Sequence, residues 1–335
     1  MKNNPKISNV YIVIPAYKVK LHILEILEKI LINKSISKIF VVDDFCPENT
    51  GEFVIQNCSD SRVSVIRNKA NLGVGGAVMT GYRAAIAEGA DIIIKIDGDG
   101  QMDPDLIPAF IEPILRGEAD YTKGNRFFEI ETIRQMPWTR LIGNTGLSFL
   151  TKLSTGYWNL FDPTNGYTAI NSSVAARLPF EKISFRYFFE SDMLFRLNTM
   201  RAVVVDIPMF ARYGSEKSNL KVWREFPNFF YKNMLNFVKR LIYSYLIRNF
   251  NYATLELIFG ILLLGFGVIY GGVNWIMHYR EATFASAGTV MLAALPMIMG
   301  LQLLMGFLNY DMTNIPHVPL SLRLHADARI VNKNQ

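Results

Sequence analysis

The order of hydrophobic and polar positions divides the chain into two parts. Up to about residue 219, short runs rich in β-branched residues alternate with segments whose apolar residues recur every three or four positions. The runs predict strands at residues 10–15, 39–43, 63–67 and 91–96, and the segments predict helices at residues 21–32, 76–88 and 104–115. Such an alternation of strand and helix is typical of an α/β domain with a parallel sheet.

The pattern changes near the C-terminus. Residues 257–277 and 286–308 are uncharged runs of 21 and 23 residues. As helices they are each about 30 Å long or longer, enough to cross the hydrocarbon core of a bilayer. Two buried core helices are the alternative, but such helices seldom need roughly 18 or more apolar residues in succession. We therefore predict a transmembrane hairpin.

The charges around the hairpin predict its orientation. Residues 217–248 contain seven basic residues and one acid, Glu225, and the tail adds Arg323, Arg329 and Lys333. The positive-inside rule then places both termini in the cytosol and the short link outside. Residues 1–9 are polar and do not read as a signal peptide. We expect an integral protein of the cytoplasmic membrane whose large N-terminal domain is cytosolic.

A third pattern joins the two parts. Between residues 226 and 245, apolar residues recur at helical spacing with lysines and arginines among them. This is typical of an amphipathic helix on an anionic bilayer surface, and an ordinary helix packed on the N-terminal domain is an equal alternative; one helix can do both. The predicted organisation is a domain at 1–219, the amphipathic helix at 220–250, the hairpin at 251–309 and a tail at 310–335.

Composition narrows the function classes. Half of the 335 residues are hydrophobic, the formal charge is +6 and the mean hydropathy is +0.17, which excludes a disordered chain. Two cysteines without a CxxC pattern exclude a disulfide framework and a cysteine-rich zinc module. Four widely separated histidines exclude a paired-histidine metal site. We expect a lipid bilayer and no nucleic acid among the partners.

Acidic residues follow two of the predicted strands, where ligands of α/β sheets bind. Asp43 and Asp44 follow the second strand, and Asp97 and Asp99 follow the fourth. If the fourth strand continues in extended form, Asp97, Asp99 and Gln101 project to one side and can meet one cation. Carboxylate and amide oxygens suit Mg²⁺ or Mn²⁺, and Mg²⁺ sites take one or two carboxylates together with substrate phosphates. A metal–diphosphate site is indicated, and a solvated acidic turn is the alternative.

An EF-hand loop can be excluded at this site, and a nearby glycine-rich turn has two possible roles. An EF-hand loop needs Gly and Glu where Met102 and Pro108 stand. The glycine-rich turn at residues 71–77 opens a helix that can hold an anion, or it is a tight structural turn. It is not a dinucleotide fingerprint, because Val78 takes the place of a small residue, and the chain contains no P-loop sequence.

Basic and acidic residues elsewhere carry further candidate chemistry. Arg126, Arg212 and Lys217 lie in short basic clusters that suit phosphate recognition, with surface ion pairs as the alternative. Glu190 and Asp192 follow an aromatic run, which fits sugar contact, general-base catalysis or simple helix capping.

Taken together, these segments resemble the family-2 glycosyltransferases. Within that family they are similar to the polyprenyl-phosphate glycosyltransferases of the dolichol-phosphate mannose synthase-like, membrane-anchored bacterial type. The resemblance covers roughly residues 8–220. The matching segments, in order, are residues 12–17, 41–50, 68–85, 96–108, 123–126, 162–170, 188–197 and 212–218.

The resemblance implies a GT-A fold and an enzyme that uses Mg²⁺ or Mn²⁺. It implies inverting transfer of a sugar from a UDP- or GDP-sugar to a polyprenyl phosphate, undecaprenyl phosphate in bacteria, to make a lipid-linked sugar donor for cell-envelope glycans. Asp99, Asp192 and Arg126 would be the catalytic residues. By the same resemblance, the nucleotide-sugar contacts are Pro15, Ala16, Tyr17, Asp43, Asp44, Asp97 and Asp99; the metal ligands are Asp97, Asp99 and Gln101; the acceptor-phosphate contacts are Arg126, Arg212 and Lys217; and the sugar contact is Asp192.

The sequence departs from the family pattern at two places, and other functions compete. Asn125 replaces a small residue, and the run at 212–217 is altered, so the acceptor-phosphate contacts are less well defined than the acidic pair. A saccharide or glycolipid hydroxyl is the alternative acceptor, although a processive synthase would carry a QxxRW motif and more membrane spans. A non-catalytic nucleotide-sugar-binding module and a nucleotide-dependent oxidoreductase are more distant. Glycines in the predicted spans permit a homo-oligomer.

Overall fold

The computed structural model describes residues 8–128, 138–162, 164–209 and 222–324. The chain forms two compact units. The first comprises Met1–Phe237 and Pro316–Gln335, and the second comprises Val238–Ile315. The boundaries predicted at residues 219, 250 and 309 remain predictions.

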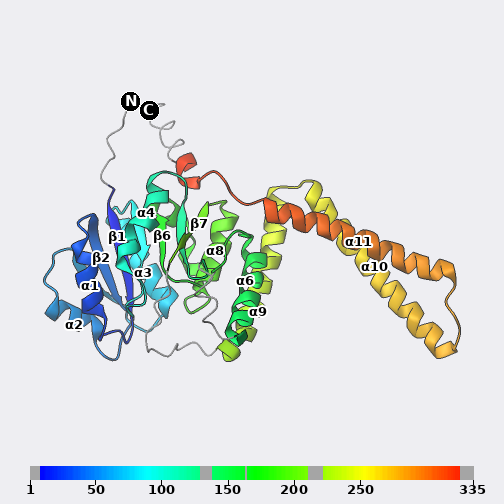
Figure 1. Cartoon of the computed structure of the whole chain (residues 1–335), viewed down its shortest axis with the longest axis horizontal. Helices are drawn as coiled ribbons and strands as arrows, with labels where there is room; N and C mark the ends of the chain where they lie inside the picture. The colour runs from blue at the N-terminus through cyan, green and yellow to red at the C-terminus, as the bar shows by residue number, and fades with distance from the viewer. Residues whose placement is uncertain (1–7, 129–137, 163, 210–221, 325–335) are drawn as a thin grey trace. The chain divides into compact units, whose positions relative to one another are not determined.

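The first unit is built on a mixed sheet. Within the described ranges seven strands pair in the order β3-β2-β1-β4-β6-β5-β7 (Figure 1). Strands β3, β2, β1 and β4 are parallel, as predicted, but β6 runs antiparallel to β4 and β5. The strand–helix alternation does not predict the direction of β6. The connection that precedes it, residues 126–167, is long enough to return the chain to the sheet in either direction. The strands are β1 (Val10–Ala16), β2 (Ile36–Asp43), β3 (Val63–Arg67), β4 (Ile92–Lys95), β5 (Tyr121–Asn125), β6 (Thr168–Asn171) and β7 (Val204–Pro208).

Helices cover both faces of this sheet. Alternate residues of each strand point to opposite faces, so the strands contribute to two separate hydrophobic cores. One core lies under α1 (Ile23–Ile32) and α4 (Ile107–Leu115), and the other lies under α3 (Val74–Ala87) and α8 (Phe189–Thr199). The first unit also contains α2 (Thr50–Asn57), η1 (Pro104–Leu106), α6 (Trp138–Thr155), α7 (Ser172–Ala175) and η2 (Phe180–Lys182).

Part of the predicted tail packs onto the α/β domain. We call residues 316–324 the C-terminal segment. The fully buried carboxylate of Asp120 accepts hydrogen bonds from the backbone N–H groups of Leu320 (2.7 Å) and Ser321 (2.8 Å) in this segment, and from that of Val203 (2.8 Å). Leu320 and Leu324 pack against the core on the α3 side.

Helix α9 (Val222–Leu241) packs on the domain through polar and aromatic side chains. Phe229 is 6% exposed, and its ring centroid lies 5.4 Å from that of Phe188. Asn233 accepts a hydrogen bond from Ser154 of α6 (2.6 Å), and Asn236 donates one to Asp192 of α8 (3.1 Å). The alternative of a helix packed on the domain is therefore confirmed for one face. Apolar side chains that remain exposed on α9 include Phe226, Phe230 and Leu235. A π-helical segment, Ile242–Arg248, follows.

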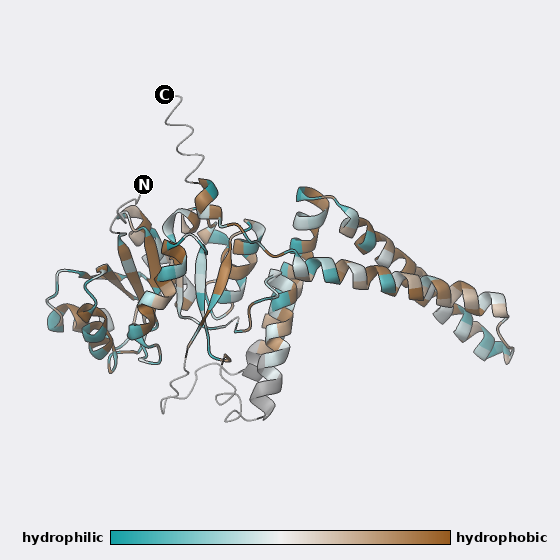
Figure 2. Ribbon diagram, turned by 45° about the horizontal axis from the view of Figure 1, so that its top comes forward, coloured by the Kyte–Doolittle hydropathy of each residue, from teal (hydrophilic) through white to brown (hydrophobic). Residues whose placement is uncertain are grey.

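The second unit is a helical hairpin. In the part of the chain that the structure describes, α10 (Tyr252–Glu281) and α11 (Ala287–Thr313) are the two helices long and apolar enough to cross a membrane (Figure 2). Their close approach depends on glycine, because a Cβ on Gly260 would lie 2.9 Å from Leu304 and one on Gly267 would lie 2.8 Å from the carbonyl of Ala293. Within this unit, the buried Asp311 binds Arg240 through both oxygens, at 2.6 and 2.9 Å.

Candidate functional site

The carboxyl ends of three parallel strands meet at one edge of the sheet. Ala16 at the end of β1 lies opposite Asp43 at the end of β2, and Val13 of β1 lies opposite Lys95 at the end of β4. The predicted residues that follow β1, β2 and β4 are therefore brought to the same edge. Of the three nucleotide contacts predicted at the end of β1, Pro15 is half-buried and Ala16 is buried. Tyr17, the residue after the strand, is 44% exposed and is the most accessible to a ligand.

Asp43 and Asp44 have a different environment from the one expected. Both are buried, and all four carboxylate oxygens accept hydrogen bonds from the protein. Asp43 accepts the N–H groups of Cys46 (2.7 Å) and Gly51 (2.8 Å), which shapes the loop into α2. These carboxylates therefore shape the loops at the sheet edge, and their contacts with a nucleotide base and ribose remain predictions.

Asp44 also explains the glycine-rich turn. It accepts hydrogen bonds from Asn68 (2.8 Å) and from the N–H groups of Leu72 (2.9 Å) and Gly73 (2.7 Å). Gly73 has φ +87°, and a Cβ there would lie 2.8 Å from the carbonyl of Phe185. The turn is thus a tight structural one, and the carboxylate of Asp44 binds at the position predicted for an external anion.

The acidic pair after β4 lies on a turn. Gly98 and Asp99 form the turn and Gly100 has φ +79°, so the extended conformation expected after the strand is wrong. Instead, Oδ1 of Asp99 accepts the N–H of Gln101 (3.0 Å), a local hydrogen bond typical of aspartate in turns. Asp97, Asp99 and Gln101 are half-buried, so the turn still presents their oxygens at the sheet edge.

This donor set fits a divalent cation that arrives with phosphate groups. Its ligands are hard oxygens, and two carboxylates are the number that Mg²⁺ usually takes alongside substrate phosphates. No group of three or more His, Cys, Asp or Glu suited to a metal occurs in the described residues. A cation at Asp97, Asp99 and Gln101 would therefore need further oxygens from a ligand such as a diphosphate.

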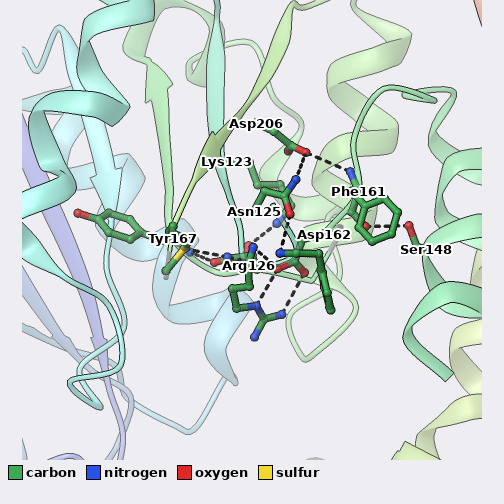
Figure 3. A network of polar contacts seen from close by, with 11 residues as sticks. Lys123, Asn125, Arg126, Ser148, Phe161, Asp162, Tyr167 and Asp206 are labelled. Atoms are coloured by element: carbon green, nitrogen blue, oxygen red, sulfur yellow. Dashed lines mark hydrogen bonds and ion pairs between the residues drawn. The ribbon is translucent and has the colours of Figure 1, made fainter. Parts of the chain in front are cut away.

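Arg126 is held by a carboxylate that the sequence analysis did not single out. Its Nε donates to Oδ2 of Asp162 (2.7 Å) and its Nη2 donates to Oδ1 (3.0 Å), a bidentate pair (Figure 3). Burial alone would raise the pKa of Asp162, but the charge and hydrogen bonds of Arg126 outweigh it and hold this pKa below the usual value. The Arg126 side chain is still 29% exposed, so Asp162 orients a guanidinium that a ligand can reach.

A buried lysine and a second carboxylate complete this network. Lys123 is 1% exposed, and its ammonium donates to the carbonyl of Asn165. Burial lowers the pKa of Lys123 to about 8, against the attraction of Asp162. Asp206 accepts hydrogen bonds from Asn125 (3.0 Å) and from a backbone N–H (3.1 Å), and burial raises its pKa to about 6. Asn125, the departure from the family pattern, thus ties β5 to β7 (Figure 3).

The two acids on α8 differ in their surroundings. Asp192 is 4% exposed; Oδ2 accepts the N–H of Ser184 (2.9 Å) and Oδ1 accepts Asn236 (3.1 Å). Asp192 thus joins α8 to α9 and to the preceding loop, and its contact with the sugar remains a prediction. Glu190, two residues earlier, is half-buried and attracted by Lys95 and Lys123. Desolvation raises the pKa of Glu190 to about 7.

Two predicted residues, Arg212 and Lys217, lie outside the described residues. Three residues of the site were not predicted from the sequence: Lys95, Asp162 and Asp206. For Lys95 a signal existed, because a charge interrupts the otherwise apolar strand at 92–96. Asp162 stands in one of the segments that carry the family resemblance, whereas Asp206 had no distinguishing pattern.

Comparisons with known proteins agree with this architecture. The model of glycosyl transferase family 2 matches residues 11–178. The UDP-N-acetylglucosamine–dolichyl-phosphate N-acetylglucosaminyltransferase of Methanococcus voltae is 31% identical over 217 residues, which cover 61% of this chain and 86% of that protein. The undecaprenyl-phosphate mannosyltransferase of Micrococcus luteus is 28% identical over 175 residues, covering 52% and 71%.

A solved structure shares the fold at low sequence identity. It is glucosyl-3-phosphoglycerate synthase from Mycobacterium tuberculosis in complex with Mn²⁺, UDP-glucose and phosphoglyceric acid. The TM-score is 0.51 at 16% identity, over 70% of this chain and 79% of that chain. The expected GT-A architecture is confirmed by this likeness.

Proposed function

Because the chain belongs to glycosyl transferase family 2, we propose that this glycosyltransferase moves a sugar from a UDP- or GDP-sugar to a polyprenyl phosphate. Undecaprenyl phosphate is the proposed lipid for a bacterial source, and the product would be a lipid-linked donor for cell-envelope glycans. The observation that carries the proposal is the sheet edge itself, where Asp97, Asp99 and Gln101 lie beyond β4 and Arg126 follows the end of β5. The names of the relatives from Methanococcus voltae and Micrococcus luteus support a polyprenyl-type acceptor.

The proposed roles follow from charge and exposure. Asp97, Asp99 and Gln101 would hold Mg²⁺ or Mn²⁺, which when bound supplies Lewis-acid stabilisation of the leaving diphosphate. Arg126, oriented by Asp162, binds a phosphate through guanidinium N–H groups. The acceptor phosphate monoester, with a second pKa near 6, is largely ionised at about pH 7. Its oxygen attacks the anomeric carbon opposite the leaving group, so the reaction inverts that carbon without requiring a strong general base.

The membrane parts suit a lipid acceptor. The head group of a polyprenyl phosphate lies at the interface and its chain lies in the bilayer. Helix α9 would insert apolar side chains at the bilayer surface, namely those of Phe226, Phe230 and Leu235, which are 40–44% exposed. The face of α9 that carries Asn233 and Asn236 packs on the domain. We propose that α10 and α11 span the cytoplasmic membrane with both termini in the cytosol, and that Arg212 and Lys217 guide the lipid phosphate.

The test is release of nucleoside diphosphate by the detergent-purified chain. The reactions contain UDP- or GDP-sugars, Mg²⁺ or Mn²⁺, and either include or omit undecaprenyl phosphate. We expect release that needs both the metal and the lipid. Asp99→Asn should lower the rate by at least about 100-fold, within the range for losing transition-state charge stabilisation, whereas Asp105→Asn, an exposed acid in the same segment, should not. Release that occurs equally without lipid or metal would refute the proposal.

One observation favours a second candidate, a saccharide or glycolipid hydroxyl as acceptor. Such an acceptor needs a general base, and the raised pKa of Glu190, about 7, is near the value at which a base is effective. The same assay separates the candidates. Release stimulated by a saccharide and abolished in Glu190→Gln would select the hydroxyl acceptor, whereas lipid-dependent release that survives in Glu190→Gln would select the phosphate.

A further inference from the structure

Lys95 is a charged residue in a buried strand. It stands at the end of β4 after three isoleucines, and its side chain is 1% exposed. The register places Lys95 and Lys123 opposite the same residue, Thr168 of β6, one on each side. Both lysine side chains therefore lie on one face of the sheet, the face covered by α8.

The partner of Lys95 is the first acid of the predicted metal site. Its Nζ lies 2.6 Å from Oδ1 of Asp97 and 5.5 Å from the ring centroid of Phe189. Within the described residues this ammonium makes no hydrogen bond of normal geometry, so the ion pair is its main interaction. Because a buried ammonium is strongly unfavourable without an opposite charge, Asp97 and Lys95 hold each other in place.

The surroundings leave room for this pair and for little else. A Cβ on Gly166 would meet the Lys95 ammonium and would lie 2.6 Å from Oδ2 of Asp97. Glycine at this position thus keeps the space that the pair occupies. Glu190 on α8 adds a second negative charge that attracts Lys95. Asp97, whose side chain is 29% exposed, is the member of the group that reaches the sheet edge.

We propose that Lys95 is a positioning residue for Asp97, an inference that rests on the proposed metal-dependent function. The ion pair directs the Asp97 carboxylate and cancels one of the two negative charges of Asp97 and Asp99. Affinity for a divalent cation depends on the number of charged ligands. The site therefore binds the bare cation weakly and takes it up together with a nucleotide diphosphate, whose oxygens supply the missing charge.

The experiment measures Mn²⁺ binding rather than turnover. Free Mn²⁺ is followed by electron paramagnetic resonance during titration of the detergent-purified full chain, without nucleotide and with UDP or GDP. In the wild-type protein, one of these nucleotides should tighten Mn²⁺ binding at least about 10-fold. In Lys95→Met, bare Mn²⁺ should bind about 10- to 100-fold more tightly, the range by which residues around metal ligands alter affinity, and the effect of the nucleotide should shrink by the same factor.

Two variants serve as controls. Lys95→Arg retains the charge and should bind bare Mn²⁺ like the wild type. Lys123→Met removes the other buried lysine, whose ammonium binds the carbonyl of Asn165, and should leave bare Mn²⁺ affinity unchanged. Circular dichroism checks that each variant is folded.

The outcomes are decisive in either direction. If Lys95 were needed only for folding, its removal would leave bare Mn²⁺ binding unchanged or weaker. Either of these results in Lys95→Met therefore overturns the inference. If that variant does not fold, the wild-type titration decides alone: tight bare Mn²⁺ binding that neither UDP nor GDP improves overturns it. No Mn²⁺ binding under any condition also overturns it and removes the metal from the proposed function. Nucleotide-coupled binding without sugar transfer would refute the transfer reaction only.

Discussion

Asp120 connects residues that lie 200 positions apart, and its removal gives a sharp test of the fold. Its carboxylate accepts the N–H groups of Leu320 and Ser321 at 2.7 and 2.8 Å, and that of Val203 at 2.8 Å. Asp120→Asn keeps one acceptor oxygen and points an NH₂ group at a remaining donor. We expect this substitution to release the C-terminal segment from the α/β domain.

The size of the effect follows from the hydrogen bonds. A hydrogen bond to a charged acceptor contributes about 1.5–3 kcal/mol and a neutral one about 0.5–1.5 kcal/mol. Losing one charged bond, and the charge from the others, costs the docked C-terminal segment about 2–4 kcal/mol. Since about 1.4 kcal/mol is a factor of ten, this segment should open about 30- to 700-fold more often.

Hydrogen exchange followed by mass spectrometry measures this opening directly. In the detergent-purified Asp120→Asn variant, the amides of peptides covering residues 316–324 should exchange faster by that factor. Glu118→Gln removes an exposed carboxylate two residues away and should leave their exchange unchanged. Unchanged exchange in Asp120→Asn, or equal acceleration in the control, would show that Asp120 does not hold the segment.

Three other predictions concern single polar contacts. Asp162→Asn should raise the apparent KM for polyprenyl phosphate at least about 10-fold, as expected when a bidentate partner of Arg126 loses its charge; a fall in kcat alone would contradict this. Arg240→Met should lower the free energy of unfolding by about 3–5 kcal/mol, since it removes the cation that balances the buried charge of Asp311. Arg240→Met/Asp311→Leu should recover most of it; thermal denaturation in detergent distinguishes the two variants. The folded pKa of Asp206 is about 6, above the unfolded value of roughly 4, so its contribution to stability is full below pH 4 and is lost as the pH rises to 6. The stability difference between wild type and Asp206→Asn should fall over that interval and stay constant above it; a pH-independent difference would refute the assignment.

The order of apolar and polar residues was enough to predict most individual elements. The predicted strand at 63–67 is β3, and the predicted helix at 104–115 is η1 followed by α4. The first uncharged run lies within α10, and the second begins at the N-cap residue of α11, Ser286, and continues in that helix. These predictions succeed because periodicity reports which face of an element is buried, and that property is local to the element.

The direction of the later strands and the contacts of the later helices depend on residues that are far apart in the sequence. Strand β6 runs antiparallel to β4, which places Thr168 between Lys95 and Lys123. The positions of these lysines in the sequence do not indicate that they lie close together. Helix α9 looked amphipathic, yet the face that packs on the domain carries Asn233 and Asn236. Hydrogen bonds to specific partners, together with the contact of Phe229 with Phe188, decide that packing.

The acidic residues also show the difference between local features and tertiary contacts. That aspartates follow β2 and β4 could be read from the sequence, since strand ends are local features. Which of them face a ligand could not. Asp43 accepts backbone N–H groups, Asp44 accepts backbone N–H groups and the side chain of Asn68, and Asp192 accepts Ser184 and Asn236. Asp97 is paired with Lys95, which ends the strand before it. The sequence by itself determined the family, the elements and the edge where chemistry is expected. Only the tertiary structure decided which carboxylates remain available there, because a carboxylate's role depends on the donors that folding brings within about 3 Å of it.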